Sequence, residues 1–396
     1  MVSQHLILFL ILIILPDIYI YAHFIRPRKM AVWKKLAWWI PGLFILTLTV
    51  TMATLKDFIP NDRTLFYAFL LLIGVCVATK AVFALCSIMG RGVARLFHSK
   101  RNWGNLVGIF AALFVAFATI YGLFVGFGEL RVRKVDFYSA QLPRSFDGYR
   151  IALFSDAHVG SYQGKDQQIL KQALDSINAM DADMVCFAGD LINMRAEEIE
   201  PHRHLLNSLQ SRDGVFSILG NHDYSDYVKA DSAEKVALER RVVDDERALG
   251  WTLLLNENRV IRRGGDSIFV AGMENHGKKD EEHNVKRADI DKTVAGIPDG
   301  AFILMLQHDP WGWHDEILPR SKAQLTLSGH THGGQVVLFG WAPAAMTYNE
   351  YDGMYDEGDR SLFVSSGLGG LLPMRFGIPG EVVLVTLHSG NKPQQP

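Results

Sequence analysis

Residues 327–335 read LSGHTHGGQ and directly follow the apolar run 323–327. Residues i and i+2 of a strand point to the same side, so His330 and His332 at a strand end can direct both rings at one small target. Two imidazoles at that spacing are suited to chelating one or two divalent metal ions. A His-x-His pair also occurs by chance. Its meaning therefore depends on whether other strand ends supply carboxylates and further histidines.

Polar residues follow four other apolar, strand-like runs in the second half of the chain. These runs are residues 149–154, 184–188, 215–219 and 302–306. A buried strand followed by Gly-Asp exposes a carboxylate at the carboxyl edge of a sheet. Five strand ends thus predict one cluster, and its expected metal ligands are Asp156, His158, Asp190, Asn221, His308, His330 and His332.

This donor set predicts two metals rather than one. Its oxygen and nitrogen atoms exceed what a single ion needs, and a set without thiolate suits Mn, Fe, Zn or Co. Two metals that share a carboxylate can hold a bridging hydroxide, lower the pKa of that water and clamp an in-line displacement at phosphorus. The leaving oxygen then needs a proton donor, for which we expect His222, with Asp223 placed to orient it.

The order of the expected elements predicts an α/β domain with two packed sheets. Helical periodicity covers residues 167–180, 197–210 and 233–249, between the early strands. Later segments are rich in strands, at residues 251–255, 259–261, 267–271, 361–364 and 381–387. Alternating strands and helices followed by strand-rich connections are typical of layered α/β folds.

Five motifs in order resemble the calcineurin-like metallophosphoesterases: Asp-x-His, Gly-Asp-x-x-Asn, Gly-Asn-His-Asp, a later lone His and Gly-His-Thr-His. Gly-Gly-Gln after the last histidine, the tyrosines of 351–355, SSGLG at 365–369 and the closing strand near Glu381 are similar to the bacterial, membrane-associated branch. The resemblance covers about residues 130–388. It implies a two-sheet α/β sandwich flanked by helices, with the site at the carboxyl ends of strands.

The resemblance also implies a role for each ligand. The first metal would be held by Asp156, His158, Asp190 and His332, and the second by Asp190, Asn221, His308 and His330. Asp190 would therefore bridge the two ions. Because every ligand type is present, the resemblance implies an active metal-dependent phosphoric ester hydrolase.

The first part of the chain predicts a membrane region. Its long apolar segments are about residues 3–24, 36–55, 64–90 and 105–128. Each has the roughly 20 apolar residues that cross a bilayer, whereas buried helices of a soluble core usually keep one polar face. The first segment lacks a basic n-region and a small-x-small site, so it is not a cleavable signal peptide. We expect a four-helix transmembrane region at 1–129, a metallophosphoesterase domain at 130–388 and a polar tail at 389–396.

Asp17 and Lys80 are the charged residues within these segments. They could serve a function inside the membrane, or they could lie near an interface or pair with each other. The formal net charge of −2 gives no reason to expect nucleic acid as a partner.

Lys and Arg in the loops predict the orientation. The first loop has five and the third has four, but the second has only Lys56 and Arg63, diluted by acids. By the positive-inside rule, loops one and three lie in the cytoplasm and the catalytic domain lies outside a bacterial inner membrane that the chain crosses several times. Arg131, Arg133 and Lys134, just after the last span, stand against this orientation.

These features together predict a membrane-anchored phosphoesterase acting on a phosphorylated small molecule or, given the adjacent spans, on a lipid-linked substrate. One alternative is an enzyme similar to UDP-2,3-diacylglucosamine pyrophosphatase of lipid A synthesis, but that nucleotide-lipid is cytoplasmic, which conflicts with the predicted orientation. Another is a non-catalytic, metal-binding membrane sensor, against which the intact His222 and full ligand set weigh. A transporter is disfavoured because the spans contain so few charged residues.

Overall fold

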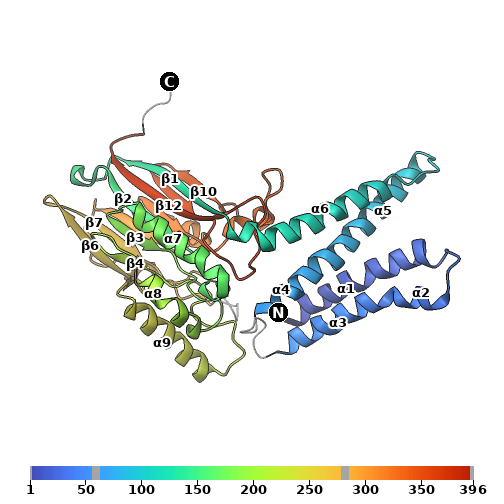
Figure 1. The fold of residues 1–396 in the computed structure, drawn as a ribbon. Coiled ribbons are helices and arrows are strands. Elements are labelled where there is room, and N and C mark those ends of the chain that lie inside the picture. Colours follow the sequence, from blue (N-terminus) through green and yellow to red (C-terminus); the bar gives the residue numbers. More distant parts are fainter. Residues whose placement is uncertain (1, 56–62, 278–284, 393–396) are drawn as a thin grey trace. The chain divides into compact units, whose positions relative to one another are not determined.

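The computed structural model describes residues 2–55, 63–277 and 285–392, and the chain forms two compact units, Met1–Val125 and Gly126–Pro396 (Figure 1). The first unit is helical and the second is an α/β unit. Part of the second expected loop, residues 56–62, and the end of the expected polar tail, residues 393–396, lie outside the described residues.

The first unit consists of apolar helices. In chain order these are α1 (Val2–Ile20) with η1 (Tyr21–Ile25), α2 (Val32–Ala37), α3 (Trp39–Thr54), α4 (Arg63–Leu72) with η2 (Ile73–Ala78) and α5 (Thr79–Leu96), and α6 (Gly104–Phe124). The first helix ends just before Pro27, which cannot continue it. α1, α3 and α6 are apolar on nearly all sides, which is what a bilayer, rather than water, requires of a helix.

Three rather than four helices of the described residues are long and apolar enough to span a membrane. They are Val32–Thr54, Thr64–Leu96 and Gly104–Gly128. The expected first span contains only the shorter apolar helix Phe9–Ile25. Phe9–Ile25 lies within α1 and η1, which together run from Val2 to Ile25. The described residues thus give three candidate spans where four were expected.

The two charges of the apolar segments pair with each other. Lys80 Nζ lies 2.6 Å from Asp17 Oδ1, and Asp17 is 2% exposed. The Trp38 indole N–H donates to the Asp17 carbonyl at 3.3 Å. Gly42 leaves room for the carboxylate, because a Cβ there would come within 2.2 Å of Asp17 Oδ2. The pair therefore links helices that are distant in sequence.

The second unit contains two six-stranded sheets. The first has the order β1 (Leu130–Ser139), β12 (Gly380–Ser389), β2 (Tyr149–Phe154), β3 (Met184–Phe187), β4 (Val215–Ser217) and β5 (Thr252–Leu253). The second has the order β10 (Gly353–Glu357), β11 (Arg360–Val364), β9 (Leu325–Ser328), β8 (Phe302–Leu306), β7 (Asp266–Gly272) and β6 (Glu257–Arg263). The expected two-sheet α/β sandwich is confirmed.

Apolar side chains on both faces of the strands build the core. One cluster fills the space between the sheets, and a second packs the outer face of the first sheet against the helices α7 (Gln167–Ala179), α8 (Arg203–Leu206) and α9 (Ser232–Ala248) (Figure 1). All four residues of β3 are buried, as expected for a parallel strand covered on both faces. A third cluster lies beside the short helices α10 (Ile290–Thr293) and α11 (Leu318–Arg320).

One expected helix is interrupted. In place of one helix over residues 197–210, the structure has two short 3₁₀ turns, Ala196–Glu198 and Glu200–His202, followed by the single helical turn α8. Pro201 lacks the N–H that a continuous helix would need at that position.

The strand directions bring the polar strand ends together. β2, β3 and β4 pair in parallel in the first sheet, and β7, β8 and β9 do so in the second. The carboxyl ends of these strands therefore lie along one edge of each sheet, which is where ligands bind in open α/β sheets.

Candidate metal centre

The candidate ligands lie in turns that follow the strands, not in the strands themselves. β2 ends at Phe154 and β9 ends at Ser328, each before its pair of polar residues. Several ligands have left-handed backbone, with φ of 62° at Asp190, 74° at His330 and 52° at His332. This conformation is uncommon for residues with a Cβ, and its clustering marks a strained functional turn. The expectation that strand alternation aims the rings is therefore wrong; the turns aim them.

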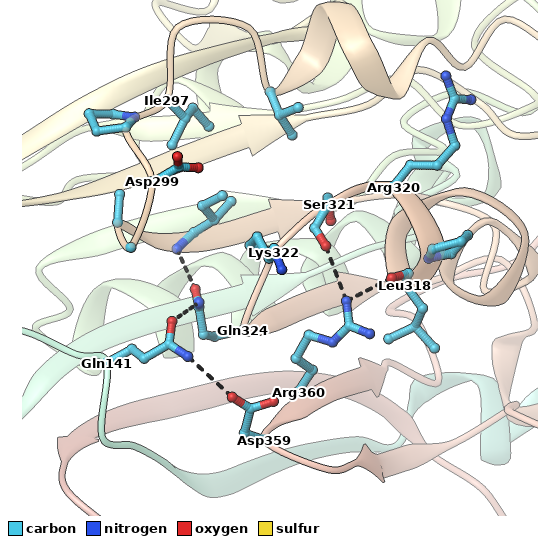
Figure 2. Close-up of a pocket in the computed structure, with 16 residues that line it drawn as sticks. Gln141, Ile297, Asp299, Leu318, Arg320, Ser321, Lys322, Gln324, Asp359 and Arg360 are labelled. Atoms are coloured by element: carbon cyan, nitrogen blue, oxygen red, sulfur yellow. Dashed lines mark hydrogen bonds between the residues drawn. The ribbon is translucent and has the colours of Figure 1, made fainter.

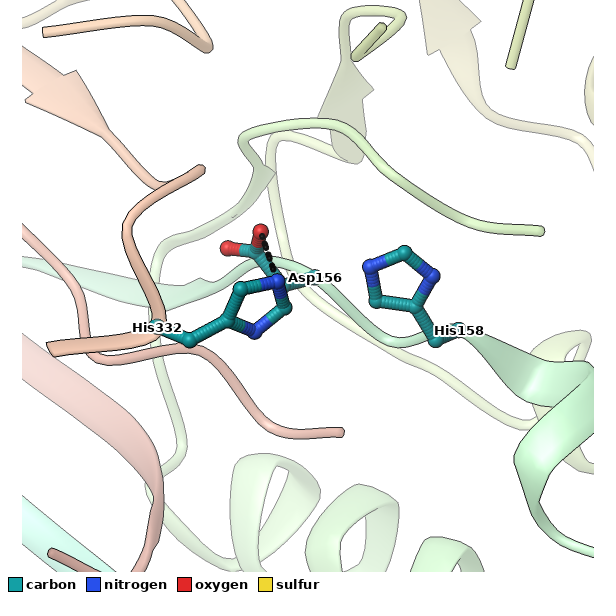
Figure 3. Close-up of side chains that lie close together, drawn as sticks. All are labelled: Asp156, His158 and His332. Atoms are coloured by element: carbon teal, nitrogen blue, oxygen red, sulfur yellow. Dashed lines mark ion pairs between the residues drawn. The ribbon is translucent and has the colours of Figure 1, made fainter. Parts of the chain in front are cut away.

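The first group of ligand atoms comes from Asp156, His158 and His332. One atom from each lies within 4.8 Å of the others. His332 Nε2 is 3.5 Å from Asp156 Oδ1, and Figure 3 shows the His332 ring turned toward that carboxylate. The imidazoles of His158 and His332 stack with their centroids 5.2 Å apart. Turns after β2 and β9, from different sheets, thus meet at one point.

Asp190 joins this group to a second one. Its Oδ2 lies 3.5 Å from His158 Nε2 and 3.2 Å from His308 Nε2. Atoms of Asp190, His308 and His330 form a further group within 4.8 Å. One carboxylate therefore lies between the histidines of both groups.

Asn221 turns its carbonyl oxygen toward the second group. Its Oδ1 is 3.2 Å from His308 Nε2 and 2.8 Å from His330 Nδ1. Its amide Nδ2 donates to the Tyr227 hydroxyl at 2.8 Å, which fixes the orientation of the amide. The oxygen is thus presented where a cation would be held.

The electrostatics of the cluster fit a divalent cation. Burial lowers the pKa of His158 to about 3 and that of His332 well below its usual value, so both are neutral imidazoles, the form that binds metals. Burial would raise the pKa of Asp190, but the charges of His308 and His222 hold it well below the usual range. The His332 Nδ1 atom is buried and has no hydrogen-bond partner. Neutral imidazoles around an ionised carboxylate form a donor set for a divalent metal.

His308 shows how strongly this position attracts positive charge. Burial alone would lower its pKa, but the charge of Asp190 and their hydrogen bond raise it to about 10. The His308 Nδ1 lies 2.7 Å from the carbonyl oxygen of Ala188, which holds the ring in place.

His222 lies beside the cluster. One of its ligand atoms is within 4.8 Å of atoms of His158 and Asp190, and its ring stacks on Tyr227 at 4.5 Å. Its Nδ1 is 2.7 Å from the main-chain carbonyl oxygen of Asn193. An Nδ1–H that donates to this carbonyl leaves Nε2 to exchange a proton.

Asp223 is placed differently from the expectation that it orients His222. Its carboxylate accepts four backbone hydrogen bonds, from the N–H groups of Asp190, Leu191, Ile192 and Gly220. Asp223 therefore fixes the turn that carries Asp190. The contact that orients the His222 ring comes from the Asn193 carbonyl, a group that every residue type possesses and that sequence patterns do not reveal.

Sequence reasoning also missed two contacts of the site. The Tyr348 hydroxyl lies 2.8 Å from His330 Nε2. The fully buried Arg375 donates from Nη2 to the carbonyls of Ser366, Gly367 and Gly369. A lone arginine within the apolar run LLPMRFGIP was the available signal for the second contact.

A separate cavity of about 650 Å³ lies at the opposite ends of the strands. Its lining includes Ala301 and Gln324, which directly precede β8 and β9, whereas His308 and His330 follow these strands. Figure 2 shows the Arg360 guanidinium bonded to carbonyls of Leu318 and Ser321 across this cavity. The cavity is therefore distinct from the metal cluster.

Two family models match most of the chain. Residues 3–127 match the family described as "Probable Calcineurin-like phosphoesterase, transmembrane domain". Residues 149–334 match the family described as "Calcineurin-like phosphoesterase". The second match contains all the candidate ligands.

Similar proteins come from bacteria and animals. The uncharacterized metallophosphoesterase YkuE of Bacillus subtilis is 29% identical over 74% of this chain and 99% of its own length. The "Transmembrane protein with metallophosphoesterase domain" of Danio rerio is 27% identical over 70% of this chain and 62% of its length. The UDP-2,3-diacylglucosamine pyrophosphatase LpxG of Chlamydia trachomatis is 26% identical over 65% of this chain and 88% of its length.

Proposed function

The chain belongs to the calcineurin-like phosphoesterases that carry a transmembrane domain, and we propose that it uses two divalent metal ions to hydrolyse a phosphoester or pyrophosphate bond of a lipid-linked substrate. The observation that carries this proposal is the place of Asp190, whose Oδ2 lies within 3.5 Å of His158 and 3.2 Å of His308. A carboxylate between two groups of imidazoles is what two ions sharing one ligand require.

Each ion would be held by residues from both sheets. The first set is Asp156, His158, Asp190 and His332, and the second is Asp190, Asn221, His308 and His330. Bound divalent ions of this kind, whether Mn, Zn, Fe or Co, polarise the phosphoryl oxygens and lower the pKa of water. The distances support this division, because Asp156, His158 and His332 form one group, Asp190, His308 and His330 form another, and Asp190 also lies 3.5 Å from His158.

His222 holds the proton for the leaving oxygen at Nε2. The Asn193 carbonyl accepts the hydrogen bond from Nδ1, and Tyr227 stacks on the ring, so the imidazole keeps one orientation. The His222 backbone N–H donates to Asp190 Oδ1 at 2.9 Å, which ties the proton donor to the bridging ligand. Asp223 acts one step behind, as a positioning residue for the Asp190 turn.

The lipid-linked substrate is proposed from the membrane helices joined to the catalytic unit. The similarity to a UDP-2,3-diacylglucosamine pyrophosphatase favours a lipid pyrophosphate as a second candidate. A reporter fused after His388 in a bacterial inner membrane shows on which side the catalytic unit lies. An extracytoplasmic signal supports the orientation expected from the loops. A cytoplasmic signal favours the nucleotide-lipid as substrate.

The central experiment compares the wild type with Asp190→Asn and His222→Ala. Hydrolysis of bis-aryl and mono-aryl phosphates is measured with added metal, together with bound metal per chain. We expect Asp190→Asn to lose metal and activity, and His222→Ala to keep metal while its rate falls about 10²-fold. The matched control is His388→Ala, which removes a half-buried histidine that pairs with Asp136 near the end of β12, and it keeps the wild-type rate. Comparable rates for all four proteins would remove the mechanism.

A further inference from the structure

Two loops beside the metal cluster, residues 333–349 and 367–374, carry an exposed apolar face. Six large hydrophobic residues are exposed in the described part of the second unit, and four of them lie on these loops. They are Phe339 (104% exposed), Met346 (80%), Trp341 (51%) and Leu372 (41%). We call this set the apolar rim. Such clustering is unusual on a surface that meets only water.

Hydrogen bonds between the two loops hold the apolar rim in place. Phe376 N–H donates to the Gln335 carbonyl and Val337 N–H donates to the Phe376 carbonyl, so the two loops pair with each other. The Gln335 side chain also donates to the Leu372 carbonyl at 2.9 Å. These bonds hold the exposed side chains on one connected surface.

A tight turn points the rim outward. Leu338 and Trp341 exchange two backbone hydrogen bonds, of 2.8 and 3.0 Å, around Phe339 and Gly340. Both central residues have positive φ, 52° at Phe339 and 80° at Gly340, as a two-residue hairpin turn demands. Left-handed backbone is strained for a bulky residue such as Phe339. The turn thus maintains an aromatic side chain in full exposure against its conformational preference.

The rim has no charge. Residues 333–349 and 367–374 contain no Asp, Glu, Lys or Arg. Trp, Phe, Met and Leu within uncharged segments match the interfacial zone of a bilayer, where aromatic rings bridge headgroups and acyl chains. A protein-binding surface would ordinarily carry charged side chains at its polar edge, whereas the polar residues of these loops, among them Thr347 and Asn349, are uncharged.

A bilayer is within reach of this unit by covalent connection alone. α6 ends at Phe124 and β1 begins at Leu130, so the intervening segment 125–129 spans at most about 20 Å when extended. Tethering at that length gives a surface contact a high effective concentration, so even a small apolar face binds.

We propose that the apolar rim inserts into the interfacial zone of the bilayer that holds the chain's own helices. The loop that carries Phe339 starts next to His332, and its far end returns to the cluster through the Tyr348 hydroxyl on His330 Nε2. Insertion of the tip therefore sets the opening of the metal cluster at the lipid surface. This last consequence rests on the proposed function, whereas the insertion itself does not.

Probe depth tests the insertion directly. Phe339→Cys is made in a full-length Cys76→Ser/Cys86→Ser background, with Cys186 kept because it is buried. The protein is labelled with an environment-sensitive fluorophore and reconstituted in phosphatidylcholine vesicles that contain doxyl-labelled lipid. Lys322→Cys, exposed near the opposite strand ends, is the matched control. Met346→Cys serves as a second rim site if Phe339→Cys does not fold.

We expect blue-shifted emission and several-fold stronger lipid quenching at Phe339 than at Lys322. Adding Met346→Glu and Leu372→Asp should reduce the quenching to the level of the control. Equal quenching at the two sites, or a blue shift without quenching, which signals contact with protein, would overturn the proposal. Because depth is read without turnover, a failed insertion and a failed hydrolysis mechanism are distinguishable.

Discussion

Each unit of the molecule buries an acid, and the two acids differ in their partners. Asp17 in the helical unit has one base, Lys80, at 2.6 Å, so the charges balance within the pair. Asp190 in the α/β unit has histidines on several sides, and the neighbouring His158 and His332 are neutral. A balanced pair needs nothing more. Asp190 lies between a neutral imidazole, His158, and His308, whose pKa its charge raises to about 10, so one carboxylate joins two groups of ligand atoms, and this arrangement indicates a cation site.

Metal removal should give the largest effect, and it should act on the cluster around Asp190 but not on the Asp17–Lys80 pair. Exhaustive treatment of the full-length protein with a chelator should reduce aryl phosphate hydrolysis about 10³-fold or more, because the cluster then lacks its electrostatic stabilisation of the reaction. Re-addition of Mn²⁺ or Zn²⁺ should restore the rate and raise Tm. At a free metal concentration of 100 times Kd, the free energy of unfolding should increase by about 2.7 kcal/mol. Rate and metal content are measured together. A full rate with less than about a tenth of an ion per chain, far below what two sites require, contradicts the prediction.

Removing the base of the balanced pair should destabilise the helical unit. Lys80→Met leaves the Asp17 carboxylate buried without a counter-charge, which should cost about 3–5 kcal/mol. The double variant Asp17→Asn/Lys80→Met should recover most of this loss. Unfolding in mixed micelles measures the effect, and hydrolysis of soluble aryl phosphate by the folded fraction should stay unchanged. If the double variant is no more stable than Lys80→Met, the pair is not a simple balance of charges.

Substitution of Asp223 should destabilise the α/β unit, and by less than Lys80→Met destabilises the helical unit. Its replacement by Ala leaves four buried backbone N–H groups without their acceptor, and we expect a loss of about 2–3 kcal/mol in the free energy of unfolding. Asp223→Asn keeps an acceptor oxygen and should lie between Ala and the wild type. Metal content should fall with Ala, because the Asp190 turn loosens. An Ala variant with the wild-type Tm would show that the Asp190 turn does not need the Asp223 carboxylate for its stability.

The smallest effect comes from Tyr348→Phe, which sharpens the description of the cluster. Loss of the hydroxyl on His330 Nε2 frees the orientation of that ring. We expect metal affinity to fall about 10-fold, as for other groups that orient metal-binding histidines, with about 1 kcal/mol or less lost in stability. Competition with a metal-sensitive dye measures the affinity. Tyr355→Phe, whose hydroxyl contacts the backbone near Asp352, is the control and should bind metal normally.

The sequence was sufficient for the fold class and for the order of the strand ends whose polar side chains the structure brings together. It was insufficient where backbone, rather than side chain, determines the geometry. The left-handed turns at His330 and Asp190 depend on hydrogen bonds from distant segments, such as those accepted by Asp223. Likewise, the carbonyl of Asn193 that orients His222 has no signature in residue type. Apolar composition also predicted four spans, whereas three helices among the described residues have the length and hydropathy of a span.

The place of β12 has a consequence for the order of synthesis. This last strand lies between β1, the first strand of the unit, and β2, and it pairs with β1 in parallel from Leu130↔Gly380 to Ser139↔Ser389. Glu381 on the same strand accepts the N–H of Ser366, beside the turn that packs on Asp156. Chains emerge from the ribosome at roughly 5–20 residues per second, N-terminus first. β1 therefore emerges some 250 residues before its partner, and the unit closes only after β12 has been translated.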